Sequence, residues 1–164
     1  MAKVITCSVT FPAYHPRKGE ETNFIVNAFK GYHVRVNNYE ADEDAKHHTI
    51  RQGLRWKKGD LCSLRYWTDK PYCSRQAFII HHDVELVEVY KIKIGKDFES
   101  ISLENDSNFE VYTNYSFTHN LDELIEQLAK NDGLSVEDFK DWFAKSLPFE
   151  GQILVFGKDP EYLR

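Results

Sequence analysis

The sequence predicts a single α+β domain built around a mostly antiparallel sheet. Three observations lead to this fold class. The chain has 164 residues, 41% of them hydrophobic, which suits one domain with a sizeable core. Strand and helix patterns follow in the order β, α, several β, α, α, β, without the regular βαβ alternation of a parallel sheet. No internal repeat is present.

The first strand and helix are expected at the amino-terminal end. Residues 3–11 alternate polar with apolar side chains, which predicts a strand. Residues 21–30 gather apolar side chains such as Phe24 and Ala28 on one helical face, and Gly31 is expected to end this helix. Residues 37–45 are polar and acidic and predict a loop.

Strands dominate the middle of the chain. Residues 61–67, the β-branched run 78–90 and the alternating run 109–117 are each predicted to be a strand. The polar stretch between residues 95 and 107 contains the turn signal Asn105-Asp106-Ser107.

Two helices and a last strand complete the pattern. Asn120 is placed to cap a helix over residues 121–130, and Ser135 with Asp138 resembles a capping box for a second helix. Pro148 is expected to end that helix before a strand over residues 152–156.

Composition narrows the class of protein. Charged residues make up 29% of the chain and no apolar run reaches a membrane-spanning length, so no membrane association is expected. A secretory signal is not expected either, because the amino-terminal end has no apolar core segment. The cysteines Cys7, Cys62 and Cys73 form no C-x-x-C pair, which favours a reducing, cytoplasmic compartment and small core residues on strands.

Charge is unevenly distributed along the chain. Residues 46–75 contain eight Lys or Arg against two Asp or Glu, whereas residues 97–150 contain thirteen acidic residues against three basic ones. The basic segment suggests phosphate contacts with a nucleic acid. The alternative is that the two segments pack together and neutralise each other.

Candidate chemistry concentrates in the run from Lys46 to Arg51. In an extended chain Thr49 and Arg51 share a face, with His47 alongside. Crowding by Arg51 and partial desolvation would favour the neutral amine of Lys46, which would make it a base toward the Thr49 hydroxyl or a water. The alternative is a set of surface cations beside a loop.

The basic segment is also interleaved with aromatic residues, the mixture that stacks on bases and follows a nucleic-acid backbone. Only one or two of these aromatics are expected to be free to stack, since half must face inward on a strand. Neither His47-His48 nor His81-His82-Asp83 has the spacing of a zinc site, so no metal and no cofactor are expected.

The run Lys46-His47-His48-Thr49-Ile50-Arg51, followed by a Gly59-Asp60 turn into an apolar strand, resembles the K-x-x-T-x-R signature of the ASCH family. The ending LAKNDGLSVEDFKDWF…PFEGQILVF is similar to the end of the same family. The wider chain resembles bacterial and phage proteins near that family. The resemblance covers residues 11–31, 46–93 and 121–156, and leaves 95–118 as an expected insertion.

This resemblance implies a PUA-like, mostly antiparallel β-barrel with flanking helices, and it implies two classes of function. Some members are RNA-binding modules. Others are amidohydrolases that deacetylate acetylated cytidine through the motif lysine, the motif threonine and a downstream glutamate. The matching residues here are Lys46, Thr49 and Asp132, with Arg51 as the motif arginine; Asp132 is one methylene shorter than the glutamate.

The expected function is RNA binding through a basic cleft around the motif, with deacetylation of a modified nucleoside as the alternative. The expected RNA- or ligand-binding residues are Arg51, Arg55, Trp56, Lys57, Lys58, Arg65 and Arg75. A closed pocket lined by Lys46, Thr49 and Asp132 would favour the enzyme, and an open basic groove would favour the binding module. A purely structural Lys46–Asp132 ion pair is the competing expectation.

Overall fold

The computed structural model describes residues 2–38 and 43–163. It contains three α-helices and nine strands, which confirms the α+β class. In chain order the elements are β1 (Lys3–Cys7), α1 (Phe24–Asn37), β2 (His48–Gln52), β3 (Leu61–Trp67), β4 (Gln76–Phe78), β5 (Val84–Glu85), β6 (Glu88–Ile94), the 3-10 turn η1 (Lys96–Phe98), β7 (Ser100–Glu104), β8 (Phe109–Thr113), α2 (Leu121–Asn131), α3 (Val136–Phe143), the 3-10 turn η2 (Ala144–Ser146) and β9 (Phe149–Val155).

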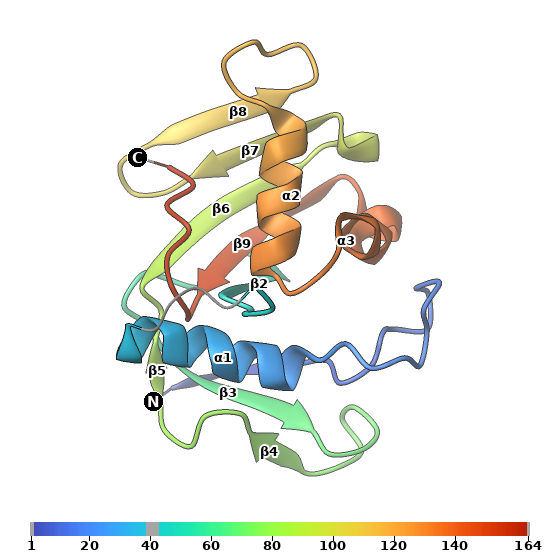
Figure 1. The fold of residues 1–164 in the computed structure, drawn as a ribbon, viewed down its shortest axis with the longest axis vertical. Coiled ribbons are helices and arrows are strands. Elements are labelled where there is room, and N and C mark those ends of the chain that lie inside the picture. Colours follow the sequence, from blue (N-terminus) through green and yellow to red (C-terminus); the bar gives the residue numbers. More distant parts are fainter. Residues whose placement is uncertain (1, 39–42, 164) are drawn as a thin grey trace.

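The strands form two sheets (Figure 1). The smaller sheet joins β1, β3 and β4 in that order, with β5 also paired to β3, and the larger sheet has the order β2-β9-β6-β7-β8. Every pair is antiparallel except β1–β3, so the mostly antiparallel arrangement is confirmed. The pairings among the described residues give two sheets and do not close into one barrel.

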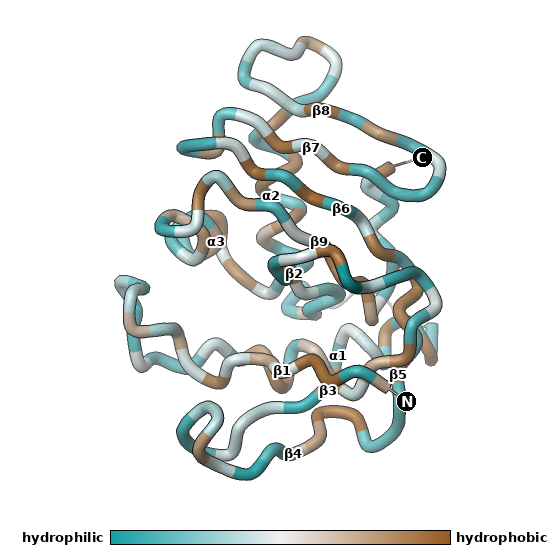
Figure 2. Tube along the Cα trace, turned by 180° about the vertical axis from the view of Figure 1, so that it is seen from behind, coloured by the Kyte–Doolittle hydropathy of each residue, from teal (hydrophilic) through white to brown (hydrophobic). Residues whose placement is uncertain are grey.

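The helices and sheets share one hydrophobic cluster. Helix α1 runs beside the smaller sheet, whereas α2 and α3 cover one face of the larger sheet (Figure 1). The cluster includes Ala28 of α1, Leu64 of β3, Ile92 of β6, Leu128 of α2 and Phe139 of α3. Figure 2 shows the opposite face of the larger sheet. Along β6 hydrophilic residues alternate with hydrophobic ones, and exposed side chains alternate with buried ones in the second half of the strand. This alternation is expected because successive side chains of a strand point to opposite faces of the sheet.

The capping signals of the two later helices are confirmed. The Glu123 amide donates to the Asn120 side chain at 3.2 Å, and the Asp138 amide donates to Ser135 Oγ at 3.1 Å. Helix α3 ends at Phe143, ahead of Pro148, and β9 begins three residues earlier than the sequence predicted.

Several strand predictions need correction. The predicted strand over 78–90 is divided into β4, β5 and β6, because buried Ile79 and Ile80 belong to a loop that packs on the core. Strand β7 was not predicted, although Ile101 and Leu103 are fully buried beneath the helices. The segment 95–118, expected as an insertion, contains β7 and β8 and forms one edge of the larger sheet. The predicted loop over 37–45 falls partly on residues 39–42, outside the described residues.

The predicted end of the first helix at Gly31 is wrong, because α1 continues to Asn37. Gly31 instead lies where the segment before β2 crosses the helix. A Cβ built on Gly31 would lie 1.9 Å from the carbonyl oxygen of Lys46. Glycine is therefore required here for close approach of two backbones, and not as a helix stop.

None of the helices in the described part of the chain is long and apolar enough to cross a bilayer.

We expect Gly31→Ala to destabilise the protein by about 2 kcal/mol or more, because the added methyl overlaps the Lys46 backbone. In an unobstructed helix the same change stabilises by roughly 0.5–1 kcal/mol, so the sign of the effect is diagnostic. Urea unfolding measures it, with Val36→Ala on the exposed side of α1 as the control. A more stable Gly31→Ala protein would show that the two backbones do not approach so closely.

Candidate functional site

The start of β2 and the end of α2 bring the motif residues together. Lys46, Thr49, Arg51 and Asp132 line one small cavity of about 20 Å³. A water molecule needs roughly 10–15 Å³ measured in this way, so the cavity has room for about one water. The grouping of these four residues is as hypothesised from the sequence, but the space between them is too small for a nucleoside.

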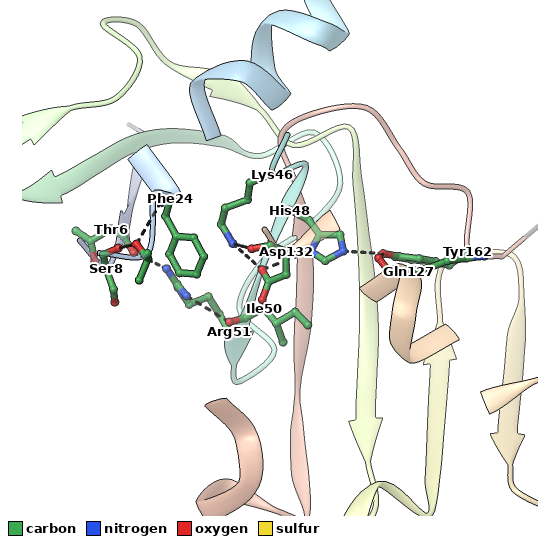
Figure 3. A network of polar contacts seen from close by, with 11 residues as sticks. Thr6, Ser8, Phe24, Lys46, His48, Ile50, Arg51, Gln127, Asp132 and Tyr162 are labelled. Carbon is green, nitrogen blue, oxygen red and sulfur yellow. Dashed lines mark hydrogen bonds and ion pairs between the residues drawn. The ribbon is translucent and has the colours of Figure 1, made fainter. Parts of the chain in front are cut away.

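Lys46 and Asp132 form a buried ion pair (Figure 3). Lys46 Nζ lies 2.6 Å from Asp132 Oδ1 and donates a second hydrogen bond, also 2.6 Å long, to the Asp132 carbonyl oxygen. The ammonium also lies 4.2 Å from the centre of the Phe24 ring, and Lys46 is only 1% exposed. A carboxylate, a carbonyl and an aromatic face all favour the charged ammonium. This is the ion pair named as the competing expectation.

Backbone contacts hold both ends of the pair in place. The Lys46 amide donates to the Asn27 carbonyl of α1 at 2.8 Å, and the His47 amide donates to the Asn131 carbonyl of α2 at 2.8 Å. Gly133 follows Asp132 with φ +81°, and a Cβ built there would lie 3.3 Å from Lys46 Cβ. The left-handed turn that ends α2 therefore also leaves room for the lysine side chain.

The charge state of Asp132 is set by two opposing effects. Burial alone would raise the pKa of its carboxyl, but the Lys46 ammonium, with His48 beside it, holds the pKa below its ordinary value. The carboxylate is therefore ionised at neutral pH. The pair carries no net charge as a unit.

His48 and Tyr162 extend this cluster toward the end of the chain. His48 Nε2 lies 2.7 Å from the Tyr162 hydroxyl, which also accepts a hydrogen bond from Asn131 at 3.0 Å. His48 Nδ1 lies 3.7 Å from Asp132 Oδ1, beyond hydrogen-bond distance, and is buried without a partner among the described residues. Burial lowers the pKa of His48, so the ring is neutral. The single Tyr162 hydroxyl proton has two acceptors within reach, His48 Nε2 and the Gln127 carbonyl at 3.3 Å, and donation to His48 places the ring proton on Nδ1, facing the carboxylate.

Sequence reasoning missed this extension. His48, Thr49 and Ile50 are all buried in β2, so no alternation of polar and apolar residues marks His48 as a core residue. No sequence pattern marks Tyr162, which lies 114 residues further along the chain.

His47 does not join Thr49 and Arg51, contrary to expectation. Its Nδ1 accepts a hydrogen bond of 3.1 Å from the Lys158 amide, and with Lys130 it lines a different cavity. Burial above all, and then electrostatic interaction with the neighbouring His48, Lys158 and Lys130, lowers the pKa of His47 to about 4.

Arg51 contacts β1 rather than Lys46. Its guanidinium donates to the Thr6 carbonyl, and two residues further along the Thr22 hydroxyl donates to the Ser8 carbonyl at 2.7 Å. The two contacts fix the chain as it leaves β1. This stretch forms one wall of a second cavity.

This second cavity, which we call the aromatic cleft, has a volume of about 370 Å³. It is lined by residues 6–13 on one side and by Trp67, Asp69, Pro71 and Tyr72 on the other. Cys7 and Ser8 line both the aromatic cleft and the small cavity, so the two are neighbours. Cavities of roughly 300–1,000 Å³ are typical of small-molecule sites.

Two aromatic rings stand at the aromatic cleft. The ring centres of Trp67 and Tyr72 are 5.3 Å apart, and Tyr72 is 88% exposed. Tyr72 has φ +63°, a left-handed conformation that is unfavourable for an aromatic residue. The turn that carries it is held by the bond from the Thr68 amide to the Arg75 carbonyl, 2.9 Å long.

The expected basic residues do not form one continuous surface. Arg55, Lys57 and Lys58 are exposed before the start of β3, whereas Arg75 is exposed beyond its end. Seven residues of strand separate these groups, which corresponds to about 20 Å. Arg65 lies between them, half-buried over the Phe78 ring and bonded to Ser63 and Gln76.

Trp56 is poorly placed to stack on a base. It is 5% exposed, and Lys3 and Arg55 lie over its ring. Its backbone amide and carbonyl are both bonded to the buried Gln152 side chain, at 3.0 and 2.9 Å. This tryptophan thus anchors the loop before β3. Lys57 and Lys58 line a cavity of about 600 Å³ on this side of the molecule, opposite Glu104 and Asp106.

Neither a metal cluster nor a reactive thiol stands out in the described part of the chain. No three His, Cys, Asp or Glu side chains in this part are grouped to hold an ion. Cys7 and Cys62 are buried as expected, and burial raises the pKa of both thiols, that of Cys62 to about 12. Cys73 is exposed in the β3–β4 turn, so its assignment to the core was wrong.

No protein-family model, curated protein or solved structure matches this chain.

We expect Lys46→Met to destabilise the protein by about 3–5 kcal/mol, because it leaves the Asp132 carboxylate buried without its cation. The double variant Lys46→Met/Asp132→Leu should recover much of this loss, since no unpaired charge then remains. Urea unfolding of the four proteins in the cycle measures the coupling.

Lys93→Met is the matched control, because its ion pair with Glu150 is exposed and 3.9 Å long. It should change stability by less than about 0.5 kcal/mol. If Lys46→Met loses as little stability as Lys93→Met, Lys46 and Asp132 are not a buried, energetically coupled pair.

We expect the protein to lose stability as the pH falls from about 6.5 toward 4. In this window His47 is neutral in the folded state, where its pKa is about 4, but protonated in the unfolded chain, so acid favours unfolding. The loss from this group should be about 1–2 kcal/mol after allowance for solvent screening. The lowered pKa of Asp132 acts in the same direction at still lower pH.

Chemical unfolding at pH 7 and pH 4.5, for wild type and His47→Gln, isolates the histidine. The variant should show a flatter pH dependence because glutamine does not titrate. If the free energy of unfolding changes equally with pH in both proteins, His47 is excluded as the source of the pH dependence.

Proposed function

We propose that this chain is a PUA-like protein of the ASCH type that binds RNA by taking one unpaired nucleotide into the aromatic cleft. The observation that carries the proposal is the cleft itself: a cavity of about 370 Å³ bearing Trp67 and exposed Tyr72, next to the small cavity of the K-x-x-T-x-R residues. Sequence-specific RNA recognition commonly splays single bases out onto aromatic side chains.

The composition of the cleft suits a planar heterocycle. Aromatic faces at its mouth supply stacking, which is tolerant of base identity. Residues 6–13 form the opposite wall. The carbonyls of Thr6, Ser8, Val9 and Phe11 already accept hydrogen bonds within the protein, so stacking is the main contact offered to a base. Lys70 and Arg75 are exposed on the same β3–β4 turn as Tyr72 and are available to the phosphates on either side of the bound nucleotide.

In this proposal the motif residues shape the cleft. Arg51 fixes the Thr6 carbonyl, and the Lys46–Asp132 pair holds β2 against α2 directly behind Cys7 and Ser8. The RNA phosphates then contact the exposed cations of the β3–β4 turn and not the buried lysine. This differs from the expected groove along residues 46–75, whose Lys57 and Lys58 lie at the other end of β3.

The proposed PUA-like fold is supported by the shared core. Leu64 of the smaller sheet and Ile92 of the larger sheet belong to one hydrophobic cluster. The Gly59-Asp60 turn leads into β3, as the resemblance implies. A barrel in this protein would be the two sheets wrapped around that cluster.

Deacetylation of a modified nucleoside is the second candidate, favoured by one observation: Lys46, Thr49, Arg51 and Asp132 line the same cavity. Two facts weigh against it. The cavity has room for about one water, and Lys46 Nζ already donates to two Asp132 oxygens. Acetate release from acetylated cytidine by the wild type, lost in Lys46→Ala, would favour this candidate.

We expect Tyr72→Ala to weaken binding of a short single-stranded RNA about 10- to 100-fold, the range expected for one lost stacking contact. Lys70→Glu/Arg75→Glu should also weaken binding and should flatten the dependence of the dissociation constant on salt, because fewer counterions are then released. Fluorescence anisotropy across a salt series measures both effects.

Tyr115→Ala is the matched control, since Tyr115 is 91% exposed but lies outside the cleft. Lys57→Glu/Lys58→Glu changes the charge at the other end of β3 by the same amount. If this second pair weakens binding while Tyr72→Ala has no effect, the RNA does not occupy the aromatic cleft.

A further inference from the structure

The charge inside the aromatic cleft is unusual for a site that would receive part of a nucleic acid. Asp69 is the one charged side chain among its lining residues. The backbone amide of Asp69 donates a hydrogen bond to Ser74 Oγ at 3.1 Å. The Asp69 carboxylate forms no ion pair or hydrogen bond with the described residues. A free carboxylate repels phosphate and attracts a cation.

The cations nearby do not line the cleft: Lys70 and Arg75 are exposed on the same turn as Asp69 but are not among the lining residues. Lys46 and Arg51 line the neighbouring small cavity and not the cleft. Lys46 is neutralised by Asp132, whereas Arg51 keeps its charge behind the wall of the cleft, where it donates to the Thr6 carbonyl. The cleft therefore combines one unpaired negative charge with the faces of Trp67 and Tyr72.

Aromatic faces reinforce the preference for positive charge. The ring quadrupole of tryptophan or tyrosine attracts a cation placed over its face. A neutral base gains only stacking in such a site, whereas a cationic base gains stacking, the cation–π attraction and the attraction of Asp69. Among nucleobases, a positive charge at near-neutral pH arises when a ring nitrogen that carries no hydrogen, such as adenine N1, is methylated.

We infer that the aromatic cleft selects a nucleobase that carries a positive charge through methylation of a ring nitrogen, such as 1-methyladenine. This inference rests on the proposed function and adds the chemical class of the bound base. The base stacks on the aromatic pair with its charged edge toward Asp69. The phosphates on either side of the bound nucleotide stay outside the cleft, near Lys70 and Arg75.

Two isomeric nucleosides provide the test. 1-Methyladenosine is cationic at pH 6.5, whereas N6-methyladenosine has the same composition and is neutral. Calorimetric titration of the wild type should give about 10-fold tighter binding of 1-methyladenosine, the size expected for a cation–π contact with a nearby carboxylate. Asp69→Asn should reduce the ratio toward one, and Asp106→Asn, in the cavity beside Lys57, should leave the ratio unchanged.

The outcomes separate this inference from the proposed function. If the wild type binds unmodified RNA through Tyr72 but binds both nucleosides equally, the charge preference is overturned and RNA binding stands. If 1-methyladenosine is preferred but no RNA binds, the preference for a cationic base stands, and RNA is excluded as the source of that base. If tetramethylammonium binds as tightly as 1-methyladenosine, the cleft recognises an alkylammonium group and the assignment to a base fails.

Discussion

Burial of the Lys46–Asp132 ion pair is the constraint around which this part of the structure is built. An unpaired charge at either position would be costly in the interior, so the start of β2 and the end of α2 must stay in register. The same requirement accounts for two glycines: Gly31 and Gly133 both face Lys46, where a side chain would collide with it or crowd it. A buried lysine thus depends on one acid and on two residues without side chains.

The residues with the clearest motif lie behind the aromatic cleft and not inside it. Lys46 and Arg51 line a space for about one water, and Arg51 acts on the cleft through the Thr6 backbone. The cleft itself is lined by residues 6–13, by Trp67 at the end of β3 and by the turn that carries Tyr72. In the function proposed above, the motif secures the shape of the cleft, and the less conspicuous turn residues determine which base it accepts.

Local signals were enough to predict the elements that depend on them. Asn120 and Ser135 cap α2 and α3 as expected, and the bounds of β3 agree with its pattern. The prediction failed where tertiary contacts decide. Gly31 lies inside a helix and is glycine because another backbone crosses there, and Ile79 is buried in a loop and not in a strand. The family order suggested Lys46 with Asp132. The contact of His48 with Tyr162 has no local signal and could not be predicted.

The length of chain between Lys46 and Asp132 has a consequence for synthesis of the protein. The two residues are 86 positions apart, so their hydrogen bonds close a very long loop. Contacts of this separation form late in folding, because the entropy of the intervening chain must be lost first. While α2 is still inside the ribosome, β1 and β3 of the nascent chain can pair, but Lys46 has no counter-ion. The small cavity behind the cleft is thus completed only after residues 46–132 have all been made.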